Sequence, residues 1–247
     1  MSTLEDYLLR KSEREAQANF KARPLCLRCR KPQVTCYCPT LAKIVTSPRI
    51  VILMHPLEAK HPVGTGRMAH RCLANSQFIE GVDFTHHAGV NALINDPKLF
   101  PMILFPGPQS LDLARCSPEE RQALYPKDRE PVVIVLDGTW HLAKKMLHRS
   151  KNLQTLPRVC FTPSRLSRFL VRKQPHPQCF STIEAIHELV SLLNPDLPSP
   201  APHDQLLSIF DDFVAKQLSF RGSGPSRHHF SFLNRKAKRE RKQHEYK

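Results

Sequence analysis

A run of apolar, β-forming residues that passes directly into a helical pattern constrains the fold of this chain most strongly. Residues 131–136 read Pro-Val-Val-Ile-Val-Leu, with no polar residue in the run. A run of this kind is typical of a strand that is buried on both faces of a parallel sheet. After Trp140 the pattern changes to helical spacing, with lysines opposite an apolar stripe of Leu142, Met146 and Leu147. The stretch therefore predicts a central strand, a tight turn and a helix.

Polar residues fill the predicted turn. Asp137 ends the strand, and Thr139 is placed to cap the following helix with its hydroxyl. In open α/β sheets, ligands bind at the carboxyl ends of the strands. Asp137 is therefore a candidate site residue, although a carboxylate that only closes the turn gives the same pattern.

The rest of the chain repeats this alternation of strands and helices. Further strands are expected over residues 50–54, 101–105 and 158–162, and helices over 65–79, from Ser117, from Ser181 and over about 204–218. Strands that alternate with helices predict an α/β fold, with a mainly parallel sheet and helices on both faces. We expect this domain to span residues 46–220.

Several classes of protein are disfavoured by the sequence. It has no stretch of apolar residues long enough for a membrane span, and its first residues lack the apolar core of a secretory signal. We therefore expect a cytoplasmic protein without a membrane partner. The chain has neither the Gly-x-Gly-x-x-Gly pattern of dinucleotide-binding folds nor a P-loop, and its histidines show no His-Glu-x-x-His spacing for a catalytic metal. No obligate protein partner is inferred.

Four cysteines lie within a short basic segment, at positions 26, 29, 36 and 38. Their spacing, C-x2-C-x6-C-x-C, suits a tetrahedral zinc ion. Disulfides are disfavoured in the cytoplasm, so metal ligands are the better interpretation of such a cluster. Residues 23–45 therefore predict a structural zinc motif with the ligands Cys26, Cys29, Cys36 and Cys38. All four ligands are protein sulfurs, so the site would be closed to substrate.

The formal net charge of +15 favours a polyanionic partner, and nucleic acid is the commonest one. Residues 1–22 are expected to form an amphipathic helix. Residues 221–247 form a basic tail, which reads equally well as a phosphate-binding arm and as a solvated, solubilising extension.

Polar segments follow three of the predicted strands, at residues 55–58, 106–107 and 137–140. If the strands are parallel neighbours, these segments meet at one edge of the sheet and form a ligand crevice. Residues 181–184, Ser-Thr-Ile-Glu, would add a helix N-terminus suited to an anion, although the same pattern is a plain capping box. His55 and Glu58 likewise have a simpler reading as a local hydrogen-bonded pair.

Taken in order, these segments resemble the motifs of the DTW-domain family, the tRNA-uridine aminocarboxypropyltransferases. The resemblance rests on the cysteine cluster and on five short motifs over residues 24–195: His55-Pro56-Leu57-Glu58, Phe105-Pro106-Gly107, Asp137-Gly138-Thr139-Trp140, Lys173-Gln174-Pro175 and Ser181-Thr182-Ile183-Glu184-Ala185. Six motifs in the same order are far more specific than any one of them. Gly138, at the variable position of the central motif, is a small departure that loosens the turn.

The resemblance implies an enzyme that uses S-adenosylmethionine to donate its 3-amino-3-carboxypropyl group to N3 of a uridine in tRNA. It also implies a SPOUT-like fold, in which the C-terminal part of the sheet is threaded as a trefoil knot. The catalytic candidate is Asp137, either as the base that removes the N3 proton or as an anchor for the ammonium group of the donor. The cofactor-binding candidates are Phe105, Pro106, Gly107, Thr139, Trp140, Ser181, Thr182 and Glu184.

RNA contacts are predicted at the first motif and at a basic cluster before the last one, namely His55, Glu58, Arg165, Arg168, Arg172 and Lys173. Trp140 is a candidate wall for the sulfonium, and a core aromatic is its alternative. Two other functions remain: a SPOUT-type RNA methyltransferase with the same cofactor, and a zinc-containing RNA-binding protein without activity.

Overall fold

The computed structural model describes residues 24–59, 61, 63–172 and 179–220. The predicted N-terminal helix, Lys173 and the basic tail lie outside these residues. The chain divides into two compact units, Met1–Pro39 and Thr40–Lys247, and this division falls inside the predicted zinc segment. The two units are described separately.

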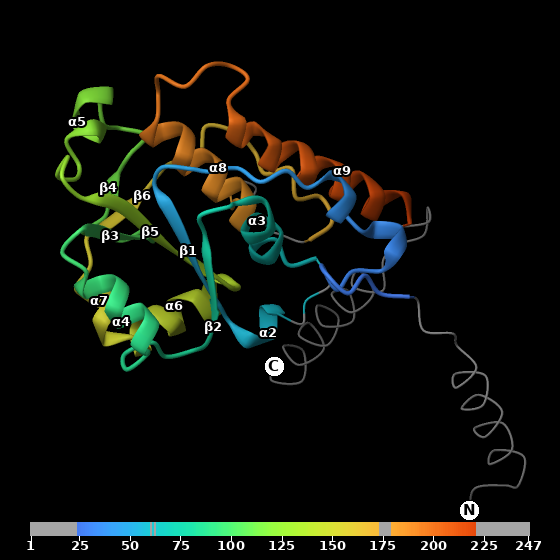
Figure 1. Cartoon of the computed structure of the whole chain (residues 1–247), viewed down its shortest axis with the longest axis horizontal. Helices are drawn as coiled ribbons and strands as arrows, with labels where there is room; N and C mark the ends of the chain where they lie inside the picture. Colours follow the sequence, from blue (N-terminus) through green and yellow to red (C-terminus); the bar gives the residue numbers. More distant parts are fainter. Residues whose placement is uncertain (1–23, 60, 62, 173–178, 221–247) are drawn as a thin grey trace, which may run out of the picture. The chain divides into compact units, whose positions relative to one another are not determined.

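The larger unit is built on a six-stranded sheet in which every pair of neighbouring strands is parallel (Figure 1). The strand order is β2-β1-β5-β3-β6-β4, so β5 lies in the interior between β1 and β3. The strands are β1 (Arg49–Met54), β2 (Gln77–Glu80), β3 (Leu99–Leu104), β4 (Leu111–Asp112), β5 (Glu130–Asp137) and β6 (Arg158–Cys160). The predicted α/β class and the buried central strand are confirmed.

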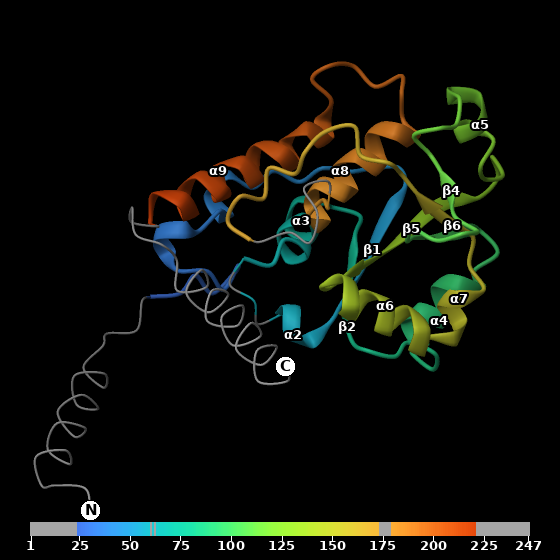
Figure 2. The same cartoon turned by 180° about the vertical axis from the view of Figure 1, so that it is seen from behind.

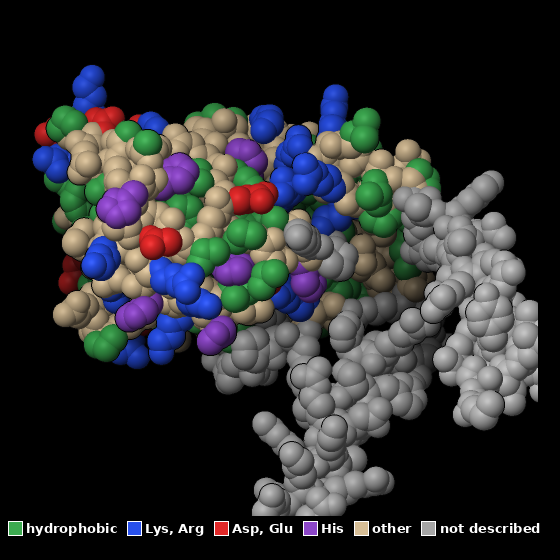
Figure 3. All heavy atoms as spheres, turned by 90° about the horizontal axis from the view of Figure 1, so that it is seen from below, with side chains coloured by type: hydrophobic (Ala, Val, Ile, Leu, Met, Phe, Trp, Pro, Cys, Tyr) green, Lys and Arg blue, Asp and Glu red, His purple; other side chains and the backbone are tan. Residues whose placement is uncertain are grey.

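Helices cover both faces of this sheet (Figures 1 and 2). On one face lie α4 (Ala88–Asn95), α6 (Trp140–Arg149) and α7 (Lys151–Gln154), and Figure 3 views the molecule from this side. On the other face lie α3 (Gly66–Cys72) and α8 (Thr182–Leu193), and α9 (Gln205–Ser219) packs on α8. The short helices are α2 (Pro56–Ala59), α5 (Pro118–Gln122) and the 3₁₀ turn η3 (Pro202–Asp204).

The alternation of side chains along β5 supplies the core on both faces. Val132, Ile134 and Leu136 pack into one cluster with Met146 and Leu147 of α6. Val133 and Val135 alternate with them, and both are buried as well. A strand that is apolar at every position is therefore explained by the helices on both sides of the sheet.

The helix predicted over residues 65–79 is wrong in its second half. The helix α3 ends at Cys72, and residues 77–80 form the edge strand β2, which pairs with β1. Asn75 and Ser76 turn the chain between them: the Asn75 amide donates to the carbonyl of Thr46, and the Ser76 hydroxyl donates to that of Leu73. The structure also adds α4 and β4, which the sequence patterns did not reveal, and ends the strand predicted over 158–162 at Cys160.

Candidate functional site

A cavity of about 580 Å³ opens where β3, β5 and β6 end. Its walls include Phe105 after β3, Asp137 at the end of β5 and Phe161 after β6. The start of α8 and the segment before it complete the lining with Phe180, Ser181 and Thr182. This is the edge of the sheet at which parallel α/β folds bind ligands. The predicted crevice is therefore present at the ends of β3 and β5, whereas residues 55–58, which were also expected to form it, do not line the cavity.

Asp137 is the acidic side chain that lines this cavity, and it is only 5% exposed. Its Oδ1 accepts a hydrogen bond of 2.5 Å from the Thr182 hydroxyl, whereas its Oδ2 has no hydrogen-bond partner among the described residues. Burial raises the pKa of Asp137 to about 6, against the opposing effect of the Thr182 hydrogen bond. A carboxyl group with one unpaired oxygen and a pKa near neutrality can take up a proton from a bound molecule.

Gly66, the first residue of α3, comes so close to Asp137 that a side chain there would have to displace the carboxylate. A Cβ atom at Gly66 would lie 2.2 Å from Oδ2 and 2.7 Å from Cγ of Asp137. The backbone N–H of Gly66 lies near enough to lower the pKa of Asp137, by less than burial raises it, although it forms no hydrogen bond of normal geometry with Oδ2. Sequence analysis missed Gly66, and a glycine in the first turn of the helix predicted over residues 65–79 is the signal that could have found it.

An ion pair lies close enough to Asp137 to affect its charge. Arg172 donates two hydrogen bonds to the Glu58 carboxylate, from Nη1 to Oε2 at 2.9 Å and from Nη2 to Oε1 at 2.7 Å. Burial alone raises the pKa of Glu58, but the hydrogen bonds and charge of Arg172 outweigh it and lower the pKa. The charge of Glu58 raises the pKa of Asp137, and that of Arg172 lowers it. The pair joins α2 to the loop before α8, and Arg172 itself lines the cavity.

The capping box predicted at the start of α8 is confirmed. Ser181 caps the helix, and the carboxylate of Glu184 accepts the backbone N–H of Ser181 at 2.9 Å. The same carboxylate accepts the backbone N–H of Arg168 at 2.8 Å and the hydroxyl of Ser167 at 2.8 Å. Glu184 is fully buried and does not line the cavity, unlike Ser181 and Thr182. The structure thus uses Glu184 to hold the loop before α8.

Aromatic side chains form two walls of the cavity. Trp140 contacts Phe105 edge to face, with ring centroids 5.8 Å apart, and Phe161 and Phe180 are 5.9 Å apart. Trp140 is 48% exposed, so the alternative of a core aromatic is wrong. Thr139 caps α6 as predicted, because its hydroxyl accepts the N–H of Leu142. Thr139 also lines the cavity.

Of the predicted Pro-Gly turn, Pro106 lines the cavity and Gly107 lies outside its lining. His55 is buried beside β5, where its backbone N–H donates to the carbonyl of Asp137 at 2.9 Å. Its ring Nδ1 accepts the N–H of Leu57, and its carbonyl accepts the N–H of Glu58 at 2.8 Å, so the local pairing of His55 with Glu58 runs through the backbone. Burial lowers the pKa of His55.

The three described arginines of the predicted RNA cluster each face an acidic group. Arg172 pairs with Glu58, and Arg168 lies 2.6 Å from Asp211 of α9. Arg165 lies 3.6 Å from Glu184 and stacks on Phe180. The structure thus places these arginines in ion pairs that fix the loop before α8.

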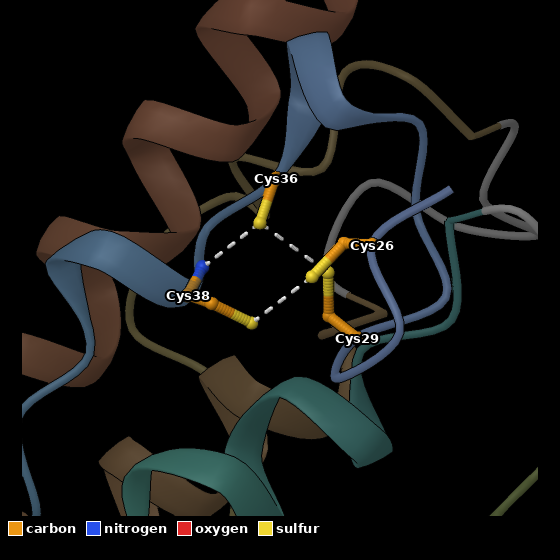
Figure 4. A group of neighbouring side chains, drawn as sticks. All are labelled: Cys26, Cys29, Cys36 and Cys38. Atoms are coloured by element: carbon orange, nitrogen blue, oxygen red, sulfur yellow. Dashed lines mark hydrogen bonds between the residues drawn. The ribbon is translucent and has the colours of Figure 1, made fainter. Parts of the chain in front are cut away.

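The smaller unit brings the four predicted zinc ligands together (Figure 4). The Sγ atoms of Cys26, Cys29, Cys36 and Cys38 all lie within 4.8 Å of one another, and none of these cysteines forms a disulfide. A tetrahedral zinc ion with Zn–S bonds of about 2.3 Å requires sulfurs about 3.8 Å apart. The Cys26–Cys38 and Cys29–Cys36 separations are 3.9 and 3.7 Å. The donor set therefore fits one metal ion.

The local fold explains this convergence. An antiparallel bridge between Leu25 and Pro32 closes the first cysteine pair into a tight loop, and η1 (Gln33–Thr35) and η2 (Cys38–Thr40) turn the second pair back. Arg30, at the apex of the loop, adopts a left-handed φ of 58°. Backbone N–H groups of Cys29 and Arg28 lower the pKa of the Cys26 thiol to about 6, whereas burial raises the pKa of the Cys36 and Cys38 thiols.

A second group of possible ligands, His187, His203 and Asp204, lies where η3 meets α8. His187 Nε2 is 2.7 Å from Asp204 Oδ1, and His203 Nε2 is 2.7 Å from the Ser191 hydroxyl. These hydrogen bonds fasten η3 to α8.

Comparison with known proteins agrees with the motifs. The DTW domain pattern matches residues 23–218, which is most of the chain. The chain belongs to the DTW-domain family. No solved structure matches it significantly.

Curated relatives of this DTW protein carry one activity in their names. A protein of Drosophila melanogaster named tRNA-uridine aminocarboxypropyltransferase 2 is 29% identical over 68% of this chain and 66% of its own length. A protein of the same name from Macaca fascicularis is 28% identical over 70% of this chain and 57% of its own. The tRNA-uridine aminocarboxypropyltransferase A of Arabidopsis thaliana is 27% identical over 84% of this chain and 86% of its own length. The matched region thus covers less than two thirds of the first two relatives.

Proposed function

We propose that this protein transfers the 3-amino-3-carboxypropyl group of S-adenosylmethionine to N3 of a uridine in tRNA, and releases methylthioadenosine. The observation that carries the proposal is the buried Asp137, which lines an aromatic cavity and whose Oδ2 has no hydrogen-bond partner among the described residues. Membership of the DTW-domain family and the names of its relatives supply the reaction.

Asp137 acts as the base in this proposal. The N3–H of uridine is a weak acid, so its nitrogen becomes a good nucleophile only as the proton leaves. Asp137 Oδ2 takes this proton while the N3–C bond forms and the C–S bond breaks, and the sulfonium becomes a neutral thioether. Thr182 holds Oδ1 and so aims the other oxygen. A pKa of about 6 leaves the carboxylate ionised at neutral pH and more basic than an ordinary aspartate.

The walls of the cavity suggest how the donor lies. Phe105 and Pro106 suit the adenosine part, and the exposed face of Trp140 suits the sulfonium through a cation–π contact. Ser181 and Thr182, at the start of α8, suit the polar end of the aminocarboxypropyl chain. The orientation of the donor decides which carbon next to sulfur faces the uridine, because only a near-attack arrangement reacts. The reverse orientation would make the protein a methyltransferase.

Two further properties belong to this proposal. The parallel sheet and the long connection from β6 to α8 support a SPOUT-like trefoil knot, which the family resemblance implies. The four-thiol donor set supports a structural zinc ion in the smaller unit. Free cysteines also fit a cytoplasmic protein. Among the described residues, no helix is long and apolar enough to cross a membrane.

The decisive experiment is mass spectrometry of the nucleosides from unmodified tRNA that has been incubated with the protein and S-adenosylmethionine. We expect a uridine heavier by one aminocarboxypropyl group and an equal amount of methylthioadenosine. A methylated nucleoside would identify a methyltransferase instead. An unchanged tRNA pool, together with no binding of S-adenosylmethionine, would leave an RNA-binding protein without activity.

Replacing Gly66 with alanine tests the packing around the proposed base. The added methyl group would overlap Asp137 Oδ2 and push the carboxylate out of position, so we expect transfer to fall about 100-fold or more. Gly89→Ala is the matched control, because a Cβ there meets only His87, at 3.4 Å. Single-turnover rates measure both variants, with circular dichroism to check folding. A fully active Gly66→Ala protein would contradict the proposed position of the base.

A further inference from the structure

The outward face of α6 is a continuous row of cationic and imidazole side chains. Its exposed residues after Trp140 are His141, Lys144, Lys145, His148 and Arg149, and the exposed Lys151 continues the row at the start of α7. The opposite face of the helix is buried through Ala143, Met146 and Leu147. Figure 3 views the molecule from this side, where Lys, Arg and His side chains are spread over the surface together with a few acidic and hydrophobic ones.

These cations differ from the arginines in the loop before α8. Among the residues that the structure describes, no acidic side chain lies within 4.0 Å of Lys144, Lys145 or Lys151. Arg165, Arg168 and Arg172, in contrast, are each paired with a carboxylate. A cation that already has a carboxylate partner gains less from a phosphate, because the first pair must be broken. Lys144 and Lys145 of α6 and Lys151 of α7 are therefore cations without a carboxylate partner among the described residues.

The helix also leads to the cavity. Trp140 is its first residue and lines the cavity, and Asp137 precedes it by three positions on the same strand-turn-helix unit. The ten residues of α6 span about 15 Å, enough to follow two to four phosphates of a nucleic acid strand. A polyanion lying along this face would have one end at the mouth of the cavity.

We propose that the outward face of α6, extended by Lys151, binds the RNA backbone next to the modified uridine and delivers that nucleotide to the cavity. The inference rests on the proposed function and adds to it the surface that holds the RNA. A membrane surface fits less well, because the exposed positions of α6 after Trp140 are all polar and leave no apolar side chain to insert into lipid. A row of lysines without base-reading side chains predicts contacts to phosphates that are independent of sequence.

The test compares two double variants that change the net charge equally. Lys144→Glu/Lys145→Glu alters the α6 face. Lys127→Glu/Arg129→Glu alters two exposed residues just before β5, at the opposite edge of the sheet. Fluorescence anisotropy measures the affinity for unmodified tRNA at several salt concentrations, and calorimetry measures binding of S-adenosylmethionine to the same proteins.

We expect the α6 variant to bind tRNA at least tenfold more weakly than the wild type. The slope of log affinity against log salt concentration should fall by about two, one for each lysine removed. The control variant should stay within about threefold of the wild type, and both should bind S-adenosylmethionine normally. Lys144→Gln/Lys145→Gln provides a milder change and should show an intermediate loss.

Equal losses in the α6 and control variants would overturn the inference, since the effect would then come from net charge alone. Unchanged tRNA binding by the α6 variant would also overturn it, and would leave the proposed reaction intact if the wild type still modifies tRNA. A wild type that binds tRNA through α6 but yields no modified uridine would instead contradict the proposed function.

Discussion

Replacing Asp137 with asparagine is expected to lower the rate of transfer by 10²–10⁴, the usual contribution of a general base. The amide keeps an oxygen that accepts the Thr182 hydroxyl, so the shape of the site is retained while the proton acceptor is lost. Single-turnover kinetics give the rate, and calorimetry gives the affinity for S-adenosylmethionine. An unchanged affinity with a lost rate identifies the base, whereas a lost affinity identifies the ammonium anchor. Full activity of Asp137→Asn would contradict both roles.

The same substitution should change how stability depends on pH. The folded state raises the pKa of Asp137 from 3.8 to about 6, so the folded protein binds more protons than the unfolded chain between these values. The stability of the wild type therefore falls as pH rises through this interval, by roughly 3 kcal/mol in all. Asparagine does not titrate, so the stability of the Asp137→Asn variant relative to the wild type should increase by most of that amount, about 2.4 kcal/mol, between pH 4 and 7. Urea unfolding at each pH measures the difference.

Asp112→Asn provides a control of opposite sign. Burial raises the pKa of Asp112, but hydrogen bonds from Thr162 and from the N–H of Ala114 outweigh this effect and lower the pKa. The wild type therefore gains stability as pH rises above the lowered pKa, and the variant should become less stable relative to it. If both variants followed the same pH trend, the assigned shift of Asp137 would be wrong.

Removing the metal from the four-cysteine cluster should have the largest effect on the smaller unit. Structural zinc contributes about 10–16 kcal/mol in comparable small sites, and the described part of this unit has only two 3₁₀ turns and one β-bridge besides. We expect one zinc ion per chain by elemental analysis, and proteolytic cleavage within residues 24–39 after chelation. Cys26→Ser should lose the zinc and show the same cleavage.

Replacing the zinc ion with cobalt distinguishes the four-cysteine site from other metal sites by its absorption spectrum. Four thiolates give an intense near-ultraviolet charge-transfer band, which Cys26→Ser should weaken. Cys116→Ser, outside the cluster, should leave both the band and the zinc content unchanged. A native protein without zinc, or a cluster variant that retains it, would contradict the proposed site.

The sequence was most informative where the pattern and the packing have the same cause. Residues 132–136 are apolar at every position because helices cover both faces of the sheet, so the central strand could be predicted, and with it the location of Asp137 at the edge. Thr139 and Ser181 cap helices through contacts within three residues, and such local rules need no tertiary information.

Contacts between distant segments could not be predicted in this way. Arg172 and Glu58 are 114 positions apart, and only the fold brings them together. The arginines before α8 were predicted to contact RNA, and their ion pairs could not be foreseen, because a sequence shows charge but does not show which charges are paired. The strand β2 was hidden by the helical spacing of the residues before it, because four residues at a sheet edge give too short a pattern to compete with a helix.

One carboxylate couples two parts of the cavity wall. Glu184 accepts the backbone N–H of Arg168 and that of Ser181, so the loop before α8 and the first turn of α8 share one buried hydrogen-bond acceptor. Opening either segment exposes the Glu184 carboxylate to solvent, and the other segment then loses its hydrogen-bond acceptor. The two segments should therefore open as a single cooperative unit, and the entry of a large substrate would be governed by one local unfolding equilibrium.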